Sequence, residues 1–165
     1  MLRSDRLTLR EFTMADVPSL FALESDPEVV RFQDYPPRTY DEAERVVAEI
    51  VRGQGELPRR HFELAVTIEG VFVGRVGAWI SEGTASLWYS FFRSVRGHGY
   101  ATEAVRGLMG LLEVTRFTIE CDPRNVGSWR LAERLGFLRE SITERAYESK
   151  GEWVGSVVYG LSVLR

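Results

Sequence analysis

Residues 96–105 constrain the fold of this chain more than any other segment, because they join a strand-like run to a helix through a loop of small residues. The run is residues 87–91, and the loop contains Gly97, Gly99 and Ala101. Small side chains allow a ligand to lie against the backbone, where the first N–H groups of a helix have no intrahelical partner and carry the positive end of its dipole. The segment therefore predicts a phosphate or pyrophosphate site. A glycine-rich turn without a ligand is the alternative for a Gly-x-Gly motif taken alone.

A second motif follows a short apolar strand at residues 117–121. In their order and spacing, the two motifs together resemble those of the GNAT superfamily of N-acetyltransferases. The Ala-Thr-Glu-Ala run at 101–104 and the Asp-Arg-Leu-Thr-Leu-Arg run at 5–10 resemble its RimJ/RimL-type branch, the ribosomal-protein alanine N-acetyltransferase-like enzymes. The motifs are Arg96-x-x-Gly99-x-Ala101 and Asn125-x-x-Ser128 followed by Leu135-Gly136-Phe137. The resemblance runs over nearly the whole chain.

The resemblance implies acetyl-CoA as the cofactor, and direct transfer of its acetyl group to a primary amine within a ternary complex. The acceptor that it implies is a protein N-terminus or a small amine, such as a polyamine, an amino acid or an aminoglycoside. For Arg96 and His98, a plain solvated loop position is the alternative, and we favour it for His98. The implied cofactor-binding residues are Ser90, Phe91, Arg96, Gly97, His98, Gly99, Tyr100, Ala101, Thr102, Asn125 and Ser128.

Three residues are candidates for catalysis by the same resemblance. The backbone N–H of Phe91 would donate to the oxyanion, because the strand before the glycine loop splays from the next strand in GNAT-like folds. Ser128 would protonate the departing sulfur, with an ordinary first-turn serine as the alternative. Tyr147 stands where RimL-like enzymes carry a Glu, and tyrosine, with a pKa near 10, is a poor base at neutral pH. Cys121 is expected to be inert.

The missing Glu and a second departure, Gly155 in place of an Asp, leave open a non-catalytic acyl-CoA-binding or sensing domain. If the chain is an enzyme without a strong base, we expect a low-pKa acceptor, such as a peptide N-terminus or an amino acid. A dinucleotide-binding oxidoreductase is disfavoured, because the glycine loop comes late and lacks the Gly-x-Gly-x-x-Gly form. Glu63, Asp34 and Tyr35 are further candidates for the acceptor pocket, each more typical of a surface or structural residue.

Hydrophobic periodicity predicts an α/β fold. We expect a GNAT-like, mixed and mostly antiparallel sheet of six or seven strands, flanked by about four helices and splayed between the fourth and fifth strands. The predicted strands are 7–9, 62–68, 71–80, 85–91, 117–121, 138–148 and 153–164, and the predicted helices begin near 13, 26, 39, 101 and 128.

The chain has 165 residues and a net charge of −3, which predicts a single domain over 1–165 and no binding to nucleic acid. No apolar run reaches the roughly 20 residues of a membrane helix, and residues 1–6 lack the apolar core of a signal peptide. One cysteine fits a cytoplasmic setting, and two isolated histidines predict no metal site. We expect no membrane partner, and either a monomer or a homodimer.

Overall fold

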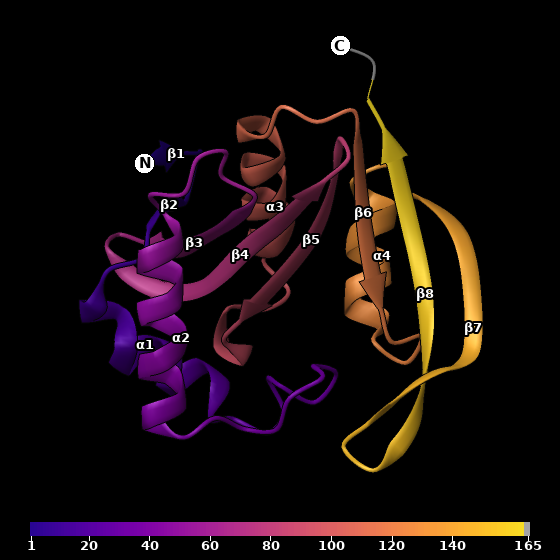
Figure 1. Cartoon of the computed structure of the whole chain (residues 1–165), viewed down its shortest axis with the longest axis horizontal. Helices are drawn as coiled ribbons and strands as arrows, with labels where there is room; N and C mark the ends of the chain where they lie inside the picture. Colours follow the sequence, from indigo (N-terminus) through magenta and orange to yellow (C-terminus); the bar gives the residue numbers. More distant parts are fainter. Residues whose placement is uncertain (164–165) are drawn as a thin grey trace.

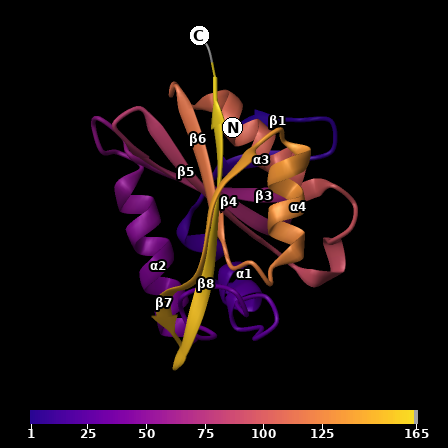
Figure 2. The same cartoon turned by 90° about the vertical axis from the view of Figure 1, so that its right-hand side faces the viewer.

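The computed structural model describes residues 1–163 and contains one eight-stranded sheet with helices on both faces (Figures 1 and 2). The strands are β1 Leu2–Arg3, β2 Thr8–Glu11, β3 His61–Ile68, β4 Val71–Ser81, β5 Thr84–Phe91, β6 Arg116–Cys121, β7 Leu138–Ser149 and β8 Glu152–Ser162. Their order in the sheet is β1-β2-β3-β4-β5-β6-β8-β7, and only β5 and β6 pair in parallel. The predicted mixed, mostly antiparallel α/β fold is therefore confirmed.

The strand count exceeds the predicted six or seven because two-residue β1 pairs with β2, through Leu2 and Leu9. A strand of two residues is too short to show alternation in a sequence. The last strand was predicted to reach Leu164, which lies outside the described residues; β8 ends at Ser162.

Four α-helices cover the sheet within the described chain: α1 Val17–Glu24, α2 Tyr40–Gly53, α3 Tyr100–Leu111 and α4 Val126–Arg134. A separate hydrophobic cluster lies on each face of the sheet. One joins α1 and α2 to Ala65 of β3, and the larger one packs α3 and α4 against the other face. Figure 2 shows α2 on one side of the sheet, with α3 and α4 on the other. The helix predicted to begin near residue 39 is confirmed as α2, and a Thr39–Glu42 capping box starts it. Glu42 N–H lies 3.3 Å from Thr39 Oγ1, and Thr39 N–H lies 2.7 Å from Glu42 Oε2.

The short helix predicted near residue 26 is wrong. The N–H groups of Val29 and Val30 both donate to the Asp26 carbonyl, at 3.0 and 3.2 Å, and these residues form only a turn. The chain turns so that Val29 and Val30 are buried, and a second helical turn does not follow. A single turn does not offset the cost of helix nucleation.

The sheet opens between β5 and β6, as predicted. Their pairing runs from Thr84 and Arg116 to Leu87 and Ile119, whereas β5 continues to Phe91. Figure 1 shows the two strands diverging beyond that point. With β1 counted, the predicted split between the fourth and fifth strands falls between the fifth and the sixth.

Candidate active site

The glycine loop leads from β5 through a short 3-10 turn, Arg93–Val95, into α3. Gly97 and Gly99 adopt left-handed backbone angles, with φ of 82° and 79°, and Gly99 is the N-cap of α3. Residues that carry a side chain rarely adopt these backbone angles. The two glycines therefore allow the chain to turn and present the N–H groups of the first helical turn. This confirms the loop-to-helix geometry that the sequence predicts.

The loop carries polar groups that fit a pyrophosphate. The Thr102 hydroxyl in the first turn of α3 is buried and has no hydrogen-bond partner within residues 1–163. Arg96 forms no ion pair there; its Nη2 donates to the Phe91 carbonyl at 3.4 Å. Burial lowers the pKa of Arg96, and neighbouring Arg93 lowers it further. An anion in the loop would accept a hydrogen bond from the Thr102 hydroxyl and pair with the guanidinium groups of Arg96 and Arg93.

His98 and Tyr100 form the outer side of the loop, and their rings stack with centroids 5.6 Å apart. His98 Nδ1 lies 3.0 Å from the Arg96 carbonyl, and the Arg6 guanidinium lies 4.6 Å from the centre of the Tyr100 ring. His98 is exposed and bonded to its own loop, which is the arrangement expected of a solvated loop residue. Ala101 lies in the first turn of α3, beside Thr102.

The N–H of Phe91 points toward the opening in the sheet. Phe92 N–H donates to the Val73 carbonyl at 3.1 Å, and neighbouring N–H groups of a strand alternate in direction, so that of Phe91 faces away from β4. Pairing with β6 has ended at Leu87, four residues earlier. Ser90 is buried opposite Arg75 of β4, so its side chain lies on the face of α1.

Ser128 closes the other side of the opening, where its hydroxyl contacts Tyr89. The two oxygens lie 2.5 Å apart, and Ser128 is 7% exposed. Burial raises the pKa of Tyr89, and its hydrogen bond to Ser128 offsets part of that rise. Asn125 is the N-cap of α4, with its side-chain oxygen 3.3 Å from Ser128 N–H. Sequence reasoning missed Tyr89, although alternation along β5 places it on the same face as Phe91.

Cys121 lies beside this pair, at the end of β6. Burial raises the pKa of its thiol, and hydrogen bonding to Ser128 offsets part of the rise. A thiol with a raised pKa is mostly protonated at neutral pH and is therefore a poor nucleophile, in line with the inert role expected of Cys121.

An open cavity of about 570 Å³ lies at the carboxyl end of β6, between the loop that links α1 to α2 and the end of β7. It is lined by Phe32, Gln33, Asp34, Glu120, Cys121, Asp122, Tyr147, Glu148 and Ser149. Neighbouring residues of a strand point to opposite faces, yet Tyr147 and Glu148 of β7 both line the cavity. Burial raises the pKa of Tyr147, and Glu120, Asp122 and Asp34 raise it further. Tyr147 is thus deprotonated less readily than an ordinary tyrosine and is less available as a base at neutral pH.

Glu120 is the carboxylate that sequence reasoning missed. It lies on β6 between buried Ile119 and half-buried Cys121, and Ser156 of β8 donates a hydrogen bond to its Oε1. Its signal was a charged residue inside an otherwise apolar strand, on the face opposite Phe117 and Ile119.

Glu63 and Tyr35 belong to a buried ionic network instead of the cavity. Arg75 contacts Glu24 at 2.6 Å and Glu63 at 2.8 Å, and Tyr35 donates to Glu24 at 2.8 Å. The Trp88 indole N–H donates to Glu63 at 2.7 Å. Glu63 is therefore held by a cation and an indole and is not a free base, whereas Asp34 does line the cavity.

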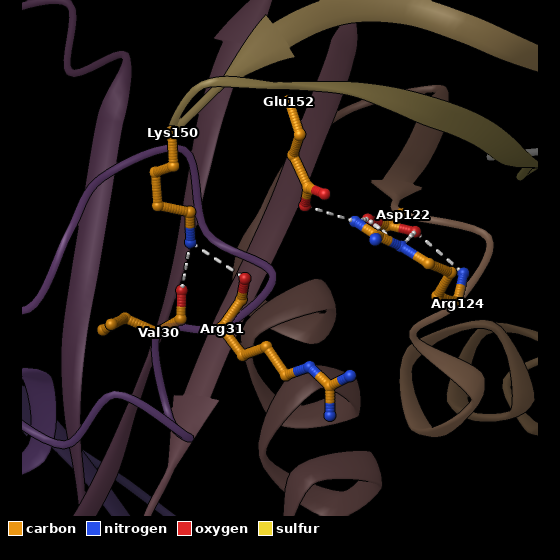
Figure 3. A network of polar contacts seen from close by, with 6 residues as sticks. All are labelled: Val30, Arg31, Asp122, Arg124, Lys150 and Glu152. Carbon is orange, nitrogen blue, oxygen red and sulfur yellow. Dashed lines mark hydrogen bonds and ion pairs between the residues drawn. The ribbon is translucent and has the colours of Figure 1, made fainter.

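Two polar bridges join the segments around the cavity (Figure 3). Lys150 is the only lysine of the chain, and its Nζ donates to the carbonyls of Val30 and Arg31 at 3.0 and 2.8 Å. Arg124 contacts Asp122 at 2.6 Å and Glu152 at 3.0 Å. The β7–β8 hairpin is thereby tied both to the α1–α2 loop and to the loop before α4.

Within residues 1–163 there is no grouping of three or more His, Cys, Asp or Glu side chains that could hold a metal ion. Over the same residues, no helix combines the length and apolar character needed to cross a membrane.

Residues 6–138 match the family model described as Acetyltransferase (GNAT) domain. The chain belongs to the GNAT acetyltransferase family. It is therefore an acyltransferase, as the two motifs indicate.

The relatives of this GNAT chain extend the match to its whole length. The uncharacterized N-acetyltransferase p20 of Bacillus licheniformis is 28% identical, and the alignment covers 99% of this chain and 96% of that protein. RimL, a ribosomal L7/L12 alpha-N-protein acetyltransferase solved with coenzyme A, has a TM-score of 0.87 at 21% identity, covering 97% and 96% of the two chains. The microcin C7 self-immunity acetyltransferase MccE, solved with acetyl-CoA and AMP, has a TM-score of 0.85 at 19% identity, covering 97% and 94%.

Proposed function

We propose that this protein transfers the acetyl group of acetyl-CoA to a primary amine, by direct attack in a ternary complex. One arrangement carries the proposal. The unpaired stretch of β5 leads into the glycine loop, and Tyr89 on that stretch bonds Ser128 beside Cys121, which lines the acidic cavity. The RimL and MccE structures with coenzyme A or acetyl-CoA support the same donor here. When bound, acetyl-CoA supplies an activated acetyl thioester.

The glycine loop would hold the pyrophosphate, through the N–H groups from Gly97 to Thr102, the Thr102 hydroxyl and Arg96. The backbone edge of β5 at Phe91, which faces the opening, would hold the pantetheine arm, as an added strand would be held. Asn125 would cap α4 and bond the arm at the same time.

Three groups of this chain would then assist the transfer. The Phe91 N–H donates to the oxygen on which negative charge develops. The amine must lose a proton before or during attack, and Glu120 is the cavity carboxylate placed on β6, at the edge of the opening, to accept it. Tyr147, held protonated by its raised pKa, acts as a hydrogen-bond donor that positions the acceptor.

The leaving sulfur needs a proton, and Ser128 is proposed to deliver it. The Ser128 hydroxyl gives its proton to the sulfur and takes one from the Tyr89 hydroxyl, 2.5 Å away. Tyr89 then regains a proton from solvent. Because burial raises the pKa of Tyr89, this group is protonated and ready to donate throughout the neutral range.

The test is release of free thiol from acetyl-CoA in the presence of amines, with the Glu120→Gln variant beside wild type. Glu113→Gln, an exposed residue after α3, makes the same charge change outside the cavity. We expect turnover by wild type and Glu113→Gln, and a kcat/KM lower by about 100-fold in Glu120→Gln, the usual effect of a positioned base. Coenzyme A binding without turnover of any amine would reject the proposal.

A further inference from the structure

The cavity beside the opening has an unbalanced charge. Asp34, Glu120 and Glu148 line it without an ion-pair partner anywhere in residues 1–163, and none of its lining residues is basic. The fourth carboxylate, Asp122, is paired with Arg124 at 2.6 Å and also lies in the field of Arg31. One ammonium group of an acceptor would neutralise only one of the three remaining charges.

A second observation is an unpartnered hydroxyl in the wall of the cavity. Ser149, at the end of β7, is 8% exposed, and its hydroxyl is buried without any hydrogen-bond partner in the described chain. A buried hydroxyl left unpaired costs free energy, and this one belongs to the wall of the cavity. A donor on the ligand, such as a second amine, would satisfy it.

The size of the cavity favours a small ligand. Its volume of about 570 Å³ lies within the ordinary range for small-molecule sites. Lys150 ties the β7–β8 hairpin to the α1–α2 loop through the carbonyls of Val30 and Arg31, so the walls that carry Glu148 and Asp34 are bridged (Figure 3). The bridge therefore holds two walls of the cavity in place around a space of small-molecule size.

We infer that the acceptor is a small polycationic amine, with one amino group at Glu120 for acetylation and a second ammonium group held by Glu148, Asp34 and the Ser149 hydroxyl. This inference rests on the proposed function and names its acceptor class. It disfavours a free amino acid, whose carboxylate would enter an acidic cavity. With Glu120 as the proposed base, the expectation of a low-pKa acceptor no longer follows.

The test compares acceptors of equal length that differ only in their far end: 1,5-diaminopentane, pentylamine and 5-aminopentanoate. A fourth acceptor is a short peptide amide with a free N-terminus and a basic second residue. We expect kcat/KM for the diamine to exceed that for the monoamine about tenfold at low ionic strength, the worth of one charge-assisted contact, and to fall with added salt. The aminopentanoate should be the poorest acceptor.

The Glu148→Gln variant should narrow the diamine-to-monoamine ratio toward one. Glu144→Gln, on the same exposed strand but outside the cavity lining, should keep the wild-type ratio. Equal rates for the diamine and the monoamine, or a clear preference for the peptide, would overturn the inference while leaving amine acetylation intact. Failure of every amine to release thiol would instead reject the proposed function itself.

Discussion

The hydroxyl oxygens of Tyr89 and Ser128 lie 2.5 Å apart, so that β5 and α4 meet through a hydrogen bond on one side of the opening in the sheet. These residues are 39 positions apart in the chain. Their contact places a protonated phenol next to the serine that is proposed to protonate the leaving sulfur.

Ser128→Ala should lower kcat by about 100-fold while changing acetyl-CoA affinity little, because the hydroxyl acts late in the reaction. Tyr89→Phe should lower kcat less, since water can resupply the proton to Ser128. Both are measured at saturating substrate, with the dissociation constant from calorimetry. Ser141→Ala, on exposed β7, is the control. An unchanged kcat in Ser128→Ala would mean that Ser128 does not protonate the leaving sulfur and is only a structural residue of α4.

Gly99→Val should abolish measurable acetyl-CoA binding in a folded protein. The φ of 79° is strained for a β-branched residue, and relaxation of that strain would turn the loop N–H groups away from the pyrophosphate. Gly110→Val, in open space on α3 with an ordinary backbone angle, controls for the bulk of the side chain. Calorimetry that finds the same affinity in Gly99→Val and wild type would remove the loop from the cofactor site.

The pH dependence of kcat/KM should distinguish Glu120 from Tyr147. Burial and three nearby carboxylates raise the pKa of Tyr147 above its usual value near 10, so it stays protonated from pH 6 to 9. Tyr147→Phe should therefore raise KM without moving the pH profile. Glu120→Gln should instead lower kcat/KM at every pH tested. A profile shifted by Tyr147→Phe would mean that this tyrosine titrates in the working range.

Arg75→Met should destabilise the fold by about 3–5 kcal/mol, because it leaves Glu24 and Glu63 buried without their shared cation. Burial by itself would lower the pKa of Arg75, but the two carboxylates outweigh it and raise that pKa, which shows how strongly they depend on the guanidinium. Arg38→Met removes a more exposed partner of Glu24 and should cost less. Urea unfolding measures both, and equal losses would contradict the central place of Arg75.

Asp122 should make stability depend on pH below 5. Burial raises the pKa of Asp122, but hydrogen bonds from Arg124 outweigh burial and place it below the usual 3.8. A depressed carboxyl pKa stabilises the fold above the unfolded pKa, and that contribution is lost as pH falls through the folded pKa. Since Arg124 is half exposed, the contribution should be about 1 kcal/mol. Asp122→Asn should lose it at pH 7, and its unfolding free energy should change less than that of wild type between pH 5 and 3.

Much of the fold and half of the candidate site followed from local sequence. The left-handed turns at Gly97 and Gly99, the Asn125 cap and the Thr39–Glu42 capping box depend on residues within a few positions, so their patterns predict them directly. The same holds for the strand alternation that ends at Phe91. The helix expected near residue 26 failed because buried Val29 and Val30, and not the local propensity, direct that turn.

The tertiary structure decided which side chains share the site. The sheet order β6-β8-β7 departs from chain order, so no local pattern brings Glu120 of β6 to the cavity that Tyr147 and Ser149 of β7 line. The 2.5 Å contact between Tyr89 and Ser128 likewise depends on how α4 packs on β5. Most of the backbone geometry was predictable from the sequence alone, because turns, caps and strands arise from neighbouring residues. The proton-carrying and charge-carrying groups meet only through long-range packing, which a single sequence does not specify.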